Sequence, residues 1–308
     1  MAASSMKSML RQPPTSTKIT RLQSSSITKA VYVSPSADSG KWLKAIADAV
    51  ALAGLSPVTS VKTTASDEAE SILITDDIRN VPPSGLAELT VVQVTPIFTG
   101  ECDPEGQDSL KQLEETAFQL ARATEARARD KRWILVSATD SFTIGSAVCC
   151  LPVADRCPSV DIPAHAVSMD MYKEGAPAEG STAYWPPEVF VFASRRDKGT
   201  GLRNEIDTTG RPRYLMYGPY IALPPGRWRA KAVISLDAGA ERHRLRIEWG
   251  TSTLYGTLFP VFKQPGRYEI VMEYDWLTSQ PADFRVILLD GSLSGRFVFH
   301  GLDVSSVR

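Results

Sequence analysis

The feature that most constrains the fold is the alternating segment 226–236, which follows a tight turn. The turn is formed by Leu223, Pro224, Pro225 and Gly226, because proline fixes its own φ and glycine accepts backbone angles that other residues avoid. After the turn, one face carries Trp228, Ala230, Ala232, Ile234 and Leu236, and the other carries Arg227, Arg229, Lys231 and Ser235. A period of two is typical of a half-buried antiparallel strand.

The same pattern continues to the end of the chain. Strands are predicted at 189–193, 214–223, 243–249, 252–262, 267–276, 284–289 and 295–304. Turn signals such as Pro265 with Gly266 and Asp290 with Gly291 separate several of them. About seven strands at this spacing predict an antiparallel β-sandwich of jelly-roll type over residues 188–308.

The first half of the chain shows strands that alternate with helices. Short apolar strands are predicted at 30–35, 57–61, 71–75, 89–95 and 132–137, and helices at 41–53 and 110–131. Gly54 stands where a glycine commonly ends a helix. We therefore predict a small, doubly wound parallel sheet over 30–150, so that the fold class is α/β plus all-β. Its resemblance to Rossmann and flavodoxin folds is generic, because no glycine-rich dinucleotide or P-loop motif occurs.

Two further segments complete the predicted organisation. Residues 1–29 contain five basic and no acidic residues together with many Ser and Thr, which predicts a disordered basic leader. Residues 151–187 are interrupted by six prolines, which predicts an irregular connector between the two domains. A length of 308 residues is comfortable for two domains.

Composition narrows the classes of function. A formal net charge of −1 provides no electrostatic attraction to nucleic acid. The sequence contains no run of roughly 20 apolar residues, so no membrane span is predicted. Four cysteines without a C-x-x-C pair favour a reduced, cytoplasmic setting over a disulfide framework or a metal site. His165, His243 and His300 accompany no nucleophile motif, so the sequence predicts no catalytic residues, metal or cofactor.

Two stretches of sequence resemble a known family. YGPYIALPPGRWRAKAVISL at 217–236 and PGRYEIVMEY at 265–274 are similar to the β-sandwich of carbohydrate-binding modules, in which a Pro-Gly turn leads into a long core strand. The resemblance covers about the last third of the chain. It implies glycan binding by exposed aromatic rings, which stack on the C–H face of a sugar while polar side chains bond its hydroxyls.

The resemblance implies a set of candidate ligand contacts. The rings are Tyr217, Tyr220, Tyr255 and Trp276, with Trp249 as a further candidate. The polar partners are Arg203 and Asp207, with Asn204, Asp237 and Asp275 as further candidates. Aromatic residues at alternating positions of a sandwich commonly fill its core, which is the alternative role for each ring.

The α/β half offers a second candidate site. In open parallel sheets, ligands bind beyond the carboxyl ends of the strands. This places Ser36, Ser39, Gly40 and Asp76 at one hypothetical anion or nucleotide site, where the start of a helix offers free N–H groups. Asp76 and Asp77 could instead cap a following turn.

The leading hypothesis is a non-catalytic carbohydrate- or partner-binding accessory protein in bacterial polysaccharide or cell-surface assembly. Two alternatives stay open. One is a transferase that uses a nucleotide sugar in the α/β crevice, and the other is a structural adaptor whose sandwich edge pairs with a protein partner. A homo-oligomer is compatible with each of the three.

Overall fold

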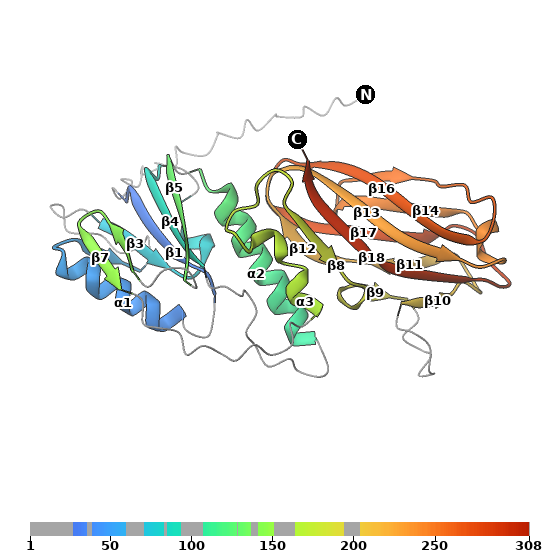
Figure 1. Cartoon of the computed structure of the whole chain (residues 1–308), viewed down its shortest axis with the longest axis horizontal. Coiled ribbons are helices and arrows are strands. Elements are labelled where there is room, and N and C mark those ends of the chain that lie inside the picture. Colours follow the sequence, from blue (N-terminus) through green and yellow to red (C-terminus); the bar gives the residue numbers. More distant parts are fainter. Residues whose placement is uncertain are drawn as a thin grey trace, which may run out of the picture.

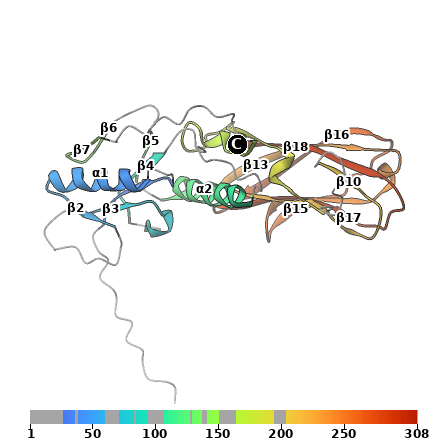
Figure 2. The same ribbon diagram turned by 90° about the horizontal axis from the view of Figure 1, so that it is seen from below.

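The computed structural model describes residues 27–35, 39–59, 71–82, 85–93, 107–127, 129–136, 141–150, 164–193 and 204–307. Residues 1–26 of the predicted leader, residues 151–163 of the predicted connector, Ser36 and Arg203 lie outside them. An α/β unit and a β-sandwich follow one another along the long axis of the molecule, with helix α2 (Gln107–Glu125) between them (Figure 1; Figure 2).

The α/β unit is built on a five-stranded parallel sheet of order β2-β3-β1-β4-β5. Its strands are β1 (Lys29–Val33), β2 (Ser56–Val58), β3 (Ser71–Thr75), β4 (Glu88–Gln93) and β5 (Asp130–Leu135). Every residue of β3 is buried, as its continuous Ser-Ile-Leu-Ile-Thr sequence predicts for a strand covered on both faces. The expectation of a parallel sheet is confirmed.

Helix α1 (Ser39–Leu52) covers one face of this sheet beside the hairpin of β6 (Ser141–Ile144) and β7 (Ala147–Cys150). Trp42, Ile46 and Val50, spaced four residues apart, are its buried residues. The helix ends at Gly54, whose φ of +77° suits glycine, and Leu55 N–H donates back to the Val50 carbonyl. This is the Schellman arrangement that the glycine predicts.

The sandwich consists of two antiparallel sheets packed face to face. The five-stranded sheet has the order β10-β18-β13-β16, and β8 also pairs with β18. Its strands are β8 (Thr182–Trp185), β10 (Glu205–Asp207), β13 (Gly226–Leu236), β16 (Gly266–Trp276) and β18 (Arg296–Val307). The six-stranded sheet has the order β15-β14-β17-β11-β9, and β12 also pairs with β17. Its strands are β9 (Val191–Phe192), β11 (Arg213–Tyr217), β12 (Pro219–Leu223), β14 (Leu245–Thr251), β15 (Tyr255–Leu258) and β17 (Gln280–Leu288). The predicted fold class, α/β followed by a β-sandwich, is confirmed.

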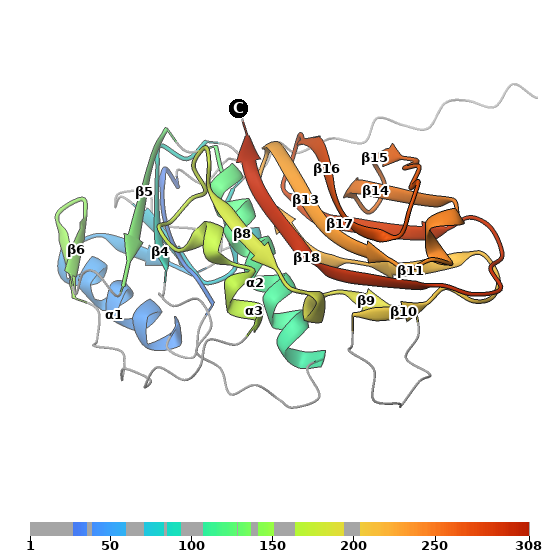
Figure 3. The same cartoon turned by 45° about the vertical axis from the view of Figure 1, so that its right-hand side comes forward.

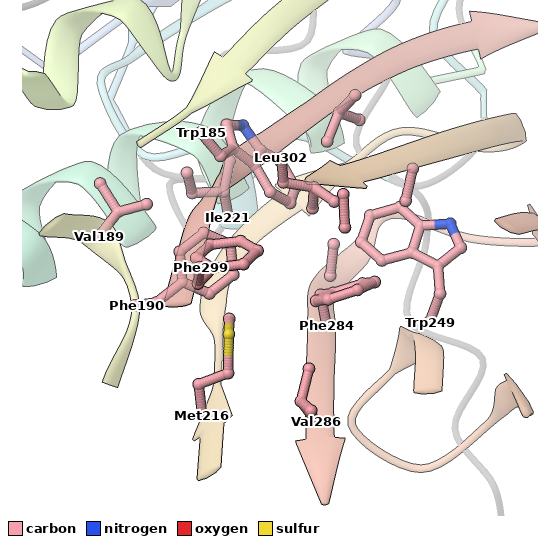
Figure 4. Close-up of a cluster of buried hydrophobic side chains, with 14 of the residues drawn as sticks. Trp185, Val189, Phe190, Met216, Ile221, Trp249, Phe284, Val286, Phe299 and Leu302 are labelled. Carbon is pink, nitrogen blue, oxygen red and sulfur yellow. The ribbon is translucent and has the colours of Figure 1, made fainter. Parts of the chain in front are cut away.

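Aromatic side chains from both sheets fill the space between the layers (Figure 4). Phe284 stacks on Phe299 with ring centroids 6.2 Å apart, and Trp249 meets Trp185 edge-on at 6.0 Å. Trp228, expected in the core, is buried as well. Large rings dominate such a core because each of them buries a large apolar area.

Part of the segment predicted as an irregular connector has regular structure. It contains α3 (Ala164–Val167), η2 (Asp170–Tyr172) and β8, and is followed by η3 (Pro187–Val189). The expectation of irregular structure is therefore wrong for residues 164–167, 170–172 and 182–185. In β8, buried Ala183 and Trp185 alternate with Thr182 and Tyr184, a strand pattern that the surrounding prolines obscured. The domain limits given above stay a prediction.

Helix α2 packs on both neighbouring units. The side chains that it buries in the core of the sandwich are Leu113, Ala117, Leu120 and Ala121. Ala123, on another side of the helix, is buried against the parallel sheet. One helix therefore closes two hydrophobic cores at once, and the sandwich strand on which it lies is β12.

Polar contacts hold the carboxyl end of α2 on the sandwich. Ser279, in the connection between β16 and β17, donates its N–H to Glu125 Oε2 at 2.9 Å and its hydroxyl to the Ala121 carbonyl at 2.8 Å. Arg122 Nη1 lies 2.8 Å from the same Glu125 oxygen. Burial raises the pKa of Glu125, but the hydrogen bonds from Ser279 and the charge of Arg122 outweigh it and hold the pKa below its usual value.

A buried polar chain makes a second connection. Trp133 Nε1 donates to Gln93 Oε1 at 2.6 Å, and Gln93 Nε2 donates to the Tyr172 carbonyl at 2.7 Å. The Tyr172 hydroxyl in turn donates to the carbonyl of Ala222 in β12 at 3.3 Å. Strands β5 and β4 are thus linked through η2 to the sandwich.

No helix among the described residues is long and apolar enough to cross a membrane.

We predict that Glu125→Gln lowers the free energy of unfolding by about 1 kcal/mol at pH 7, because it weakens the charged contacts of a partly buried carboxylate with Ser279 and Arg122. A depressed folded-state pKa gives stability that is present above the unfolded pKa, about 4.3, and is lost as the pH falls through the folded pKa. Urea unfolding at pH 7 and pH 3 should show the difference between the wild type and the variant vanishing in acid. A difference that grows in acid would contradict this account.

Candidate functional site

The candidate site is the outer face of the six-stranded sheet. Figure 2 shows the two sheets of the sandwich as separate layers, with β13 and β16 in one and β15 and β17 in the other. On β14 and β17, side chains alternate between the core and the outer face. Those directed to the core are Leu245, Ile247, Trp249, Phe284, Val286 and Leu288, and those on the outer face are Arg246, Glu248, Asp283 and Arg285.

Two carboxylates on this face are buried and paired to arginines. Arg285 Nε donates to Asp283 Oδ2 at 2.7 Å, and Arg285 Nη1 donates to Glu248 Oε2 at 3.1 Å. Arg246 Nε lies 3.0 Å from the other Glu248 oxygen. The Asp283 and Glu248 side chains are 1% and 2% exposed, so these charges depend on the two guanidinium groups for compensation.

The same network holds the backbone and a ring in place. Asp283 Oδ1 accepts a hydrogen bond from Gly218 N–H at 2.9 Å, and burial raises the pKa of Asp283 despite that bond and the charge of Arg285. The guanidinium carbon of Arg285 lies 5.0 Å from the centroid of the Tyr255 ring, a cation–π arrangement. Arg285 therefore connects the residue before β12 to the edge strand β15.

Three tyrosines form a row on the other side of the network. The Tyr214 and Tyr217 ring centroids are 6.2 Å apart, and those of Tyr217 and Tyr220 are 6.3 Å apart. Tyr214 is 47% exposed, whereas Tyr217 and Tyr220 are half-buried. Burial, together with the charge of Asp283, raises the pKa of Tyr220 to about 12, so its hydroxyl keeps its proton at neutral pH.

Strand pairing gives the distance between this row and Tyr255. Tyr255 is opposite Gly250, Gly250 is opposite Asp283, and Asp283 is opposite Pro219, the neighbour of Tyr220. Three strand-to-strand steps of about 4.8 Å separate the aromatic groups by roughly 14 Å. We call the surface made of Tyr214, Tyr217, Tyr220 and Tyr255 with Arg246 and Arg285 the tyrosine face.

Three residues predicted from the sequence, Tyr217, Tyr220 and Tyr255, are thus brought onto one face. Trp276 requires a correction: it is 3% exposed, with its ring 5.1 Å from that of Trp249, and offers no face to a ligand. Trp249 is buried as well. Asp207 lies on β10 of the opposite sheet, where its Oδ1 accepts from Thr209 N–H at 2.8 Å. Arg203 lies outside the described residues.

The sequence did not predict a role for Tyr214 or for the four charged residues Arg246, Glu248, Asp283 and Arg285. A signal for the charged residues was present. In Leu245–Trp249 and Ala282–Val286, charged residues two apart interrupt otherwise apolar strands, which predicts one polar face for each. That the two strands are neighbours, so that their charges meet, depends on the tertiary fold.

The residues of the predicted anion site follow two neighbouring parallel strands, β1 and β3. Ser39 and Gly40 begin α1, while Asp76 directly follows β3. Asp77 accepts hydrogen bonds from the N–H and Nε of Arg79, both at 2.9 Å, and so caps the turn η1 (Ile78–Asn80). Ser36 lies outside the described residues.

The described residues around Asp76 carry more negative than positive charge. Among them, the buried Tyr32 hydroxyl has no hydrogen-bond partner. Burial raises its pKa well above the usual value, and the nearby charges of Asp77, Asp76 and Glu115 add to the effect. Arg79, which pairs with Asp77 and Glu115, compensates only part of these charges. Such a field does not favour an anion beside Asp76.

The described residues contain no group of three or more His, Cys, Asp and Glu side chains arranged to hold a metal ion. Cys149 and Cys150 are free thiols at the end of the β6–β7 hairpin.

Comparisons with known proteins concern the fold. No protein-family model matches the chain, and no curated protein matches it by sequence. Among solved structures, it is similar to a family 16 carbohydrate-binding module (10% identity; 41% of this chain and 86% of that chain; TM-score 0.26). It is also similar to the CBM22-1 xylan-binding domain of Paenibacillus barcinonensis Xyn10C (11% identity; 43% of this chain and 99% of that chain; TM-score 0.27). A third similar structure is TmCBM61 in complex with β-1,4-galactotriose (8% identity; 45% of this chain and 95% of that chain; TM-score 0.28). These are the proteins to which the sandwich was expected to be similar, and likeness at this level says nothing of what this chain binds.

We predict that Arg285→Ala lowers the free energy of unfolding by roughly 3 kcal/mol, because it leaves Asp283 and Glu248 buried without their shared partner. The loss should be larger at pH 8 than at pH 5, since protonation relieves an unpaired buried carboxylate and the pKa of Asp283 is already raised. Arg244→Ala is the matched control, because Arg244 makes the same two-bond contact to Asp290 on the surface. Equal stability of the two variants in chemical denaturation would contradict a structural role for the buried network.

Proposed function

We propose that the tyrosine face binds a glycan. The observation that carries the proposal is the placement of Tyr217, Tyr220 and Tyr255 on the outer face of one sheet, on either side of buried charges. Tyrosine offers a sugar two contacts, a ring for its C–H face and a hydroxyl for its hydroxyl groups. Two aromatic groups about 14 Å apart give an extended ligand two points of contact.

Electrostatics favour a neutral sugar. Arg246 and Arg285 are matched by Glu248 and Asp283, so the centre of the face carries no net charge. The carboxylates are the more deeply buried partners, which leaves guanidinium N–H groups nearer the surface as donors. A polyanion would gain little from charges that are already paired.

The face is also preorganised. Arg285 is fixed by two carboxylates and by the Ser252 carbonyl, to which Nη2 donates at 3.0 Å. The ring of Tyr255 lies over this fixed group, so a ligand has little side-chain freedom to immobilise. The site is the side of a sheet rather than an enclosed cavity, so an internal stretch of a polysaccharide could lie across it.

A narrower form of the proposal is an accessory role in bacterial polysaccharide or cell-surface assembly in the cytoplasm. It rests on the openness of the face to long polymers. Deletion of the gene is then expected to lower polysaccharide yield. A chain with Tyr217→Ala and Tyr255→Ala should fail to restore that yield, whereas restoration by this variant would exclude glycan binding by the tyrosine face as the cause.

We predict that Tyr217→Ala and Tyr255→Ala each weaken glycan binding by about 3- to 10-fold, the loss of one aromatic contact of roughly 0.5–1.5 kcal/mol. Affinity gel electrophoresis on soluble xylan, β-glucan and β-1,4-galactan measures the effect. Tyr217→Phe should retain most of the binding, and Leu293→Ala, at a side chain 98% exposed elsewhere, should retain all of it. Retardation by none of these polymers, or equal retardation of all variants, would refute the proposal.

A further inference from the structure

The sandwich carries a groove on its other sheet. The groove has a volume of about 780 Å³ and lies over the outer face of β13 and β18, bounded by β8 and by the turn that follows η2. Figure 3 shows β8, β18 and β13 side by side in this sheet, with α3 near β8. The volume is within the range of small-ligand sites. Because it faces away from β14 and β17, the groove is separate from the tyrosine face.

Tyr184 is the aromatic residue of the groove, and its ring is held in place. Its hydroxyl donates to the His300 carbonyl at 2.7 Å, and the side chain remains 41% exposed. The ring tip lies over Gly301, whose φ is +116° and where a Cβ atom would come within 2.4 Å of the Tyr184 hydroxyl oxygen. Only glycine provides both this backbone angle and this space, so the backbone is shaped to seat the ring.

Polar side chains continue from Tyr184 across the sheet. Tyr184 is opposite Asp303 and Asp303 is opposite Lys231, which places an aromatic ring, an acceptor and a donor in one row on three adjacent strands. Lys231 Nζ is 3.4 Å from Asp303 and 3.7 Å from Glu269, longer than a close charged hydrogen bond. The donor and the acceptor can therefore turn to a ligand at small cost.

Most charges around the groove are paired. Arg229, which also lines the groove, is bound to Glu273 by two donors at 2.9 and 2.7 Å. Lys173 lies 2.7 Å from Asp170. The groups left to a ligand are the loosely paired Lys231 and Asp303, the exposed Glu174 at the rim and the ring of Tyr184. The pair of Lys231 and Asp303 suits two neighbouring hydroxyl groups of a sugar, because the carboxylate accepts a hydrogen bond from one and the ammonium donates a hydrogen bond to the other.

We infer that this groove is a second saccharide site, in which a sugar ring stacks on Tyr184 while neighbouring hydroxyls bond Asp303 and Lys231. It lies on the opposite side of the sandwich from the tyrosine face, so one chain can hold two separate glycan segments. Linked binding of this kind raises the apparent affinity for a polymer above that for a short oligosaccharide. The inference concerns a different sheet and does not depend on glycan binding by the tyrosine face.

Calorimetric titration of the full chain tests this inference, with cellotriose, xylotriose and β-1,4-galactotriose as probes. The double variant Tyr217→Ala/Tyr255→Ala removes the main rings of the tyrosine face, and we expect it to retain one binding site for at least one probe. Adding Tyr184→Leu or, separately, Asp303→Asn should weaken the retained binding at least 5-fold. Leu52→Ala, at an exposed side chain of α1, should leave it unchanged.

Each result decides between the two sites. Failure of all three probes to bind the wild type, or complete loss of binding in the double variant, overturns the groove as a saccharide site. Retained binding that neither Tyr184→Leu nor Asp303→Asn weakens also overturns it. If the double variant binds as the wild type does and Tyr184→Leu abolishes binding, the groove is supported as a saccharide site. Glycan binding by the tyrosine face is then refuted. Circular dichroism of each variant verifies that it is folded.

Discussion

The pairing of Arg285 with two buried carboxylates is the interaction on which the tyrosine face depends. Asp283 and Glu248 come from neighbouring strands, and their charges are tolerated under the outer face because Arg285 contacts both and Arg246 supplies a second guanidinium to Glu248. Through Asp283 the network fixes Gly218, and through its cation–π contact it fixes Tyr255. The contacts of the buried charges with Gly218 and Tyr255 thus hold the aromatic groups at a fixed spacing. They keep an open surface rigid although no cavity encloses it.

Helix α2 has a comparable role between the two halves of the molecule. Its apolar residues complete the core of the sandwich and contribute to that of the parallel sheet, and Ser279 binds its carboxyl end. Glu114 of the same helix is close enough for its charge to contribute to the raised pKa of Tyr220. Helix α2 also contacts β12, the strand that carries Tyr220, so a change in the position of α2 would be felt at the tyrosine face.

Local patterns predicted most of the fold. The alternation in 226–236, the continuous apolar strand 71–75 and the helix stop at Gly54 each depend on interactions that are close in sequence. The resemblance to carbohydrate-binding modules placed Tyr217, Tyr220 and Tyr255 among the candidates, but it could not separate them from Trp276. Burial of Trp276 depends on its contact with Trp249, which lies 27 residues earlier in the chain and on the opposing sheet. The Asp283–Arg285–Glu248 network was missed for the same reason, since strand neighbours far apart in sequence are set by the tertiary fold.

The central claim is that ligand meets the outer face of the six-stranded sheet. The most direct test is NMR of the full chain with labelled tyrosine rings, titrated with soluble oligosaccharides from xylan, β-glucan and β-1,4-galactan. Nine tyrosines report on all parts of the molecule. The account predicts shifts in the ring signals of Tyr214, Tyr217, Tyr220 and Tyr255, while those of buried Tyr32 and Tyr172 stay unchanged. Titrations in which these four signals remain still, whatever happens at the other rings, would contradict it.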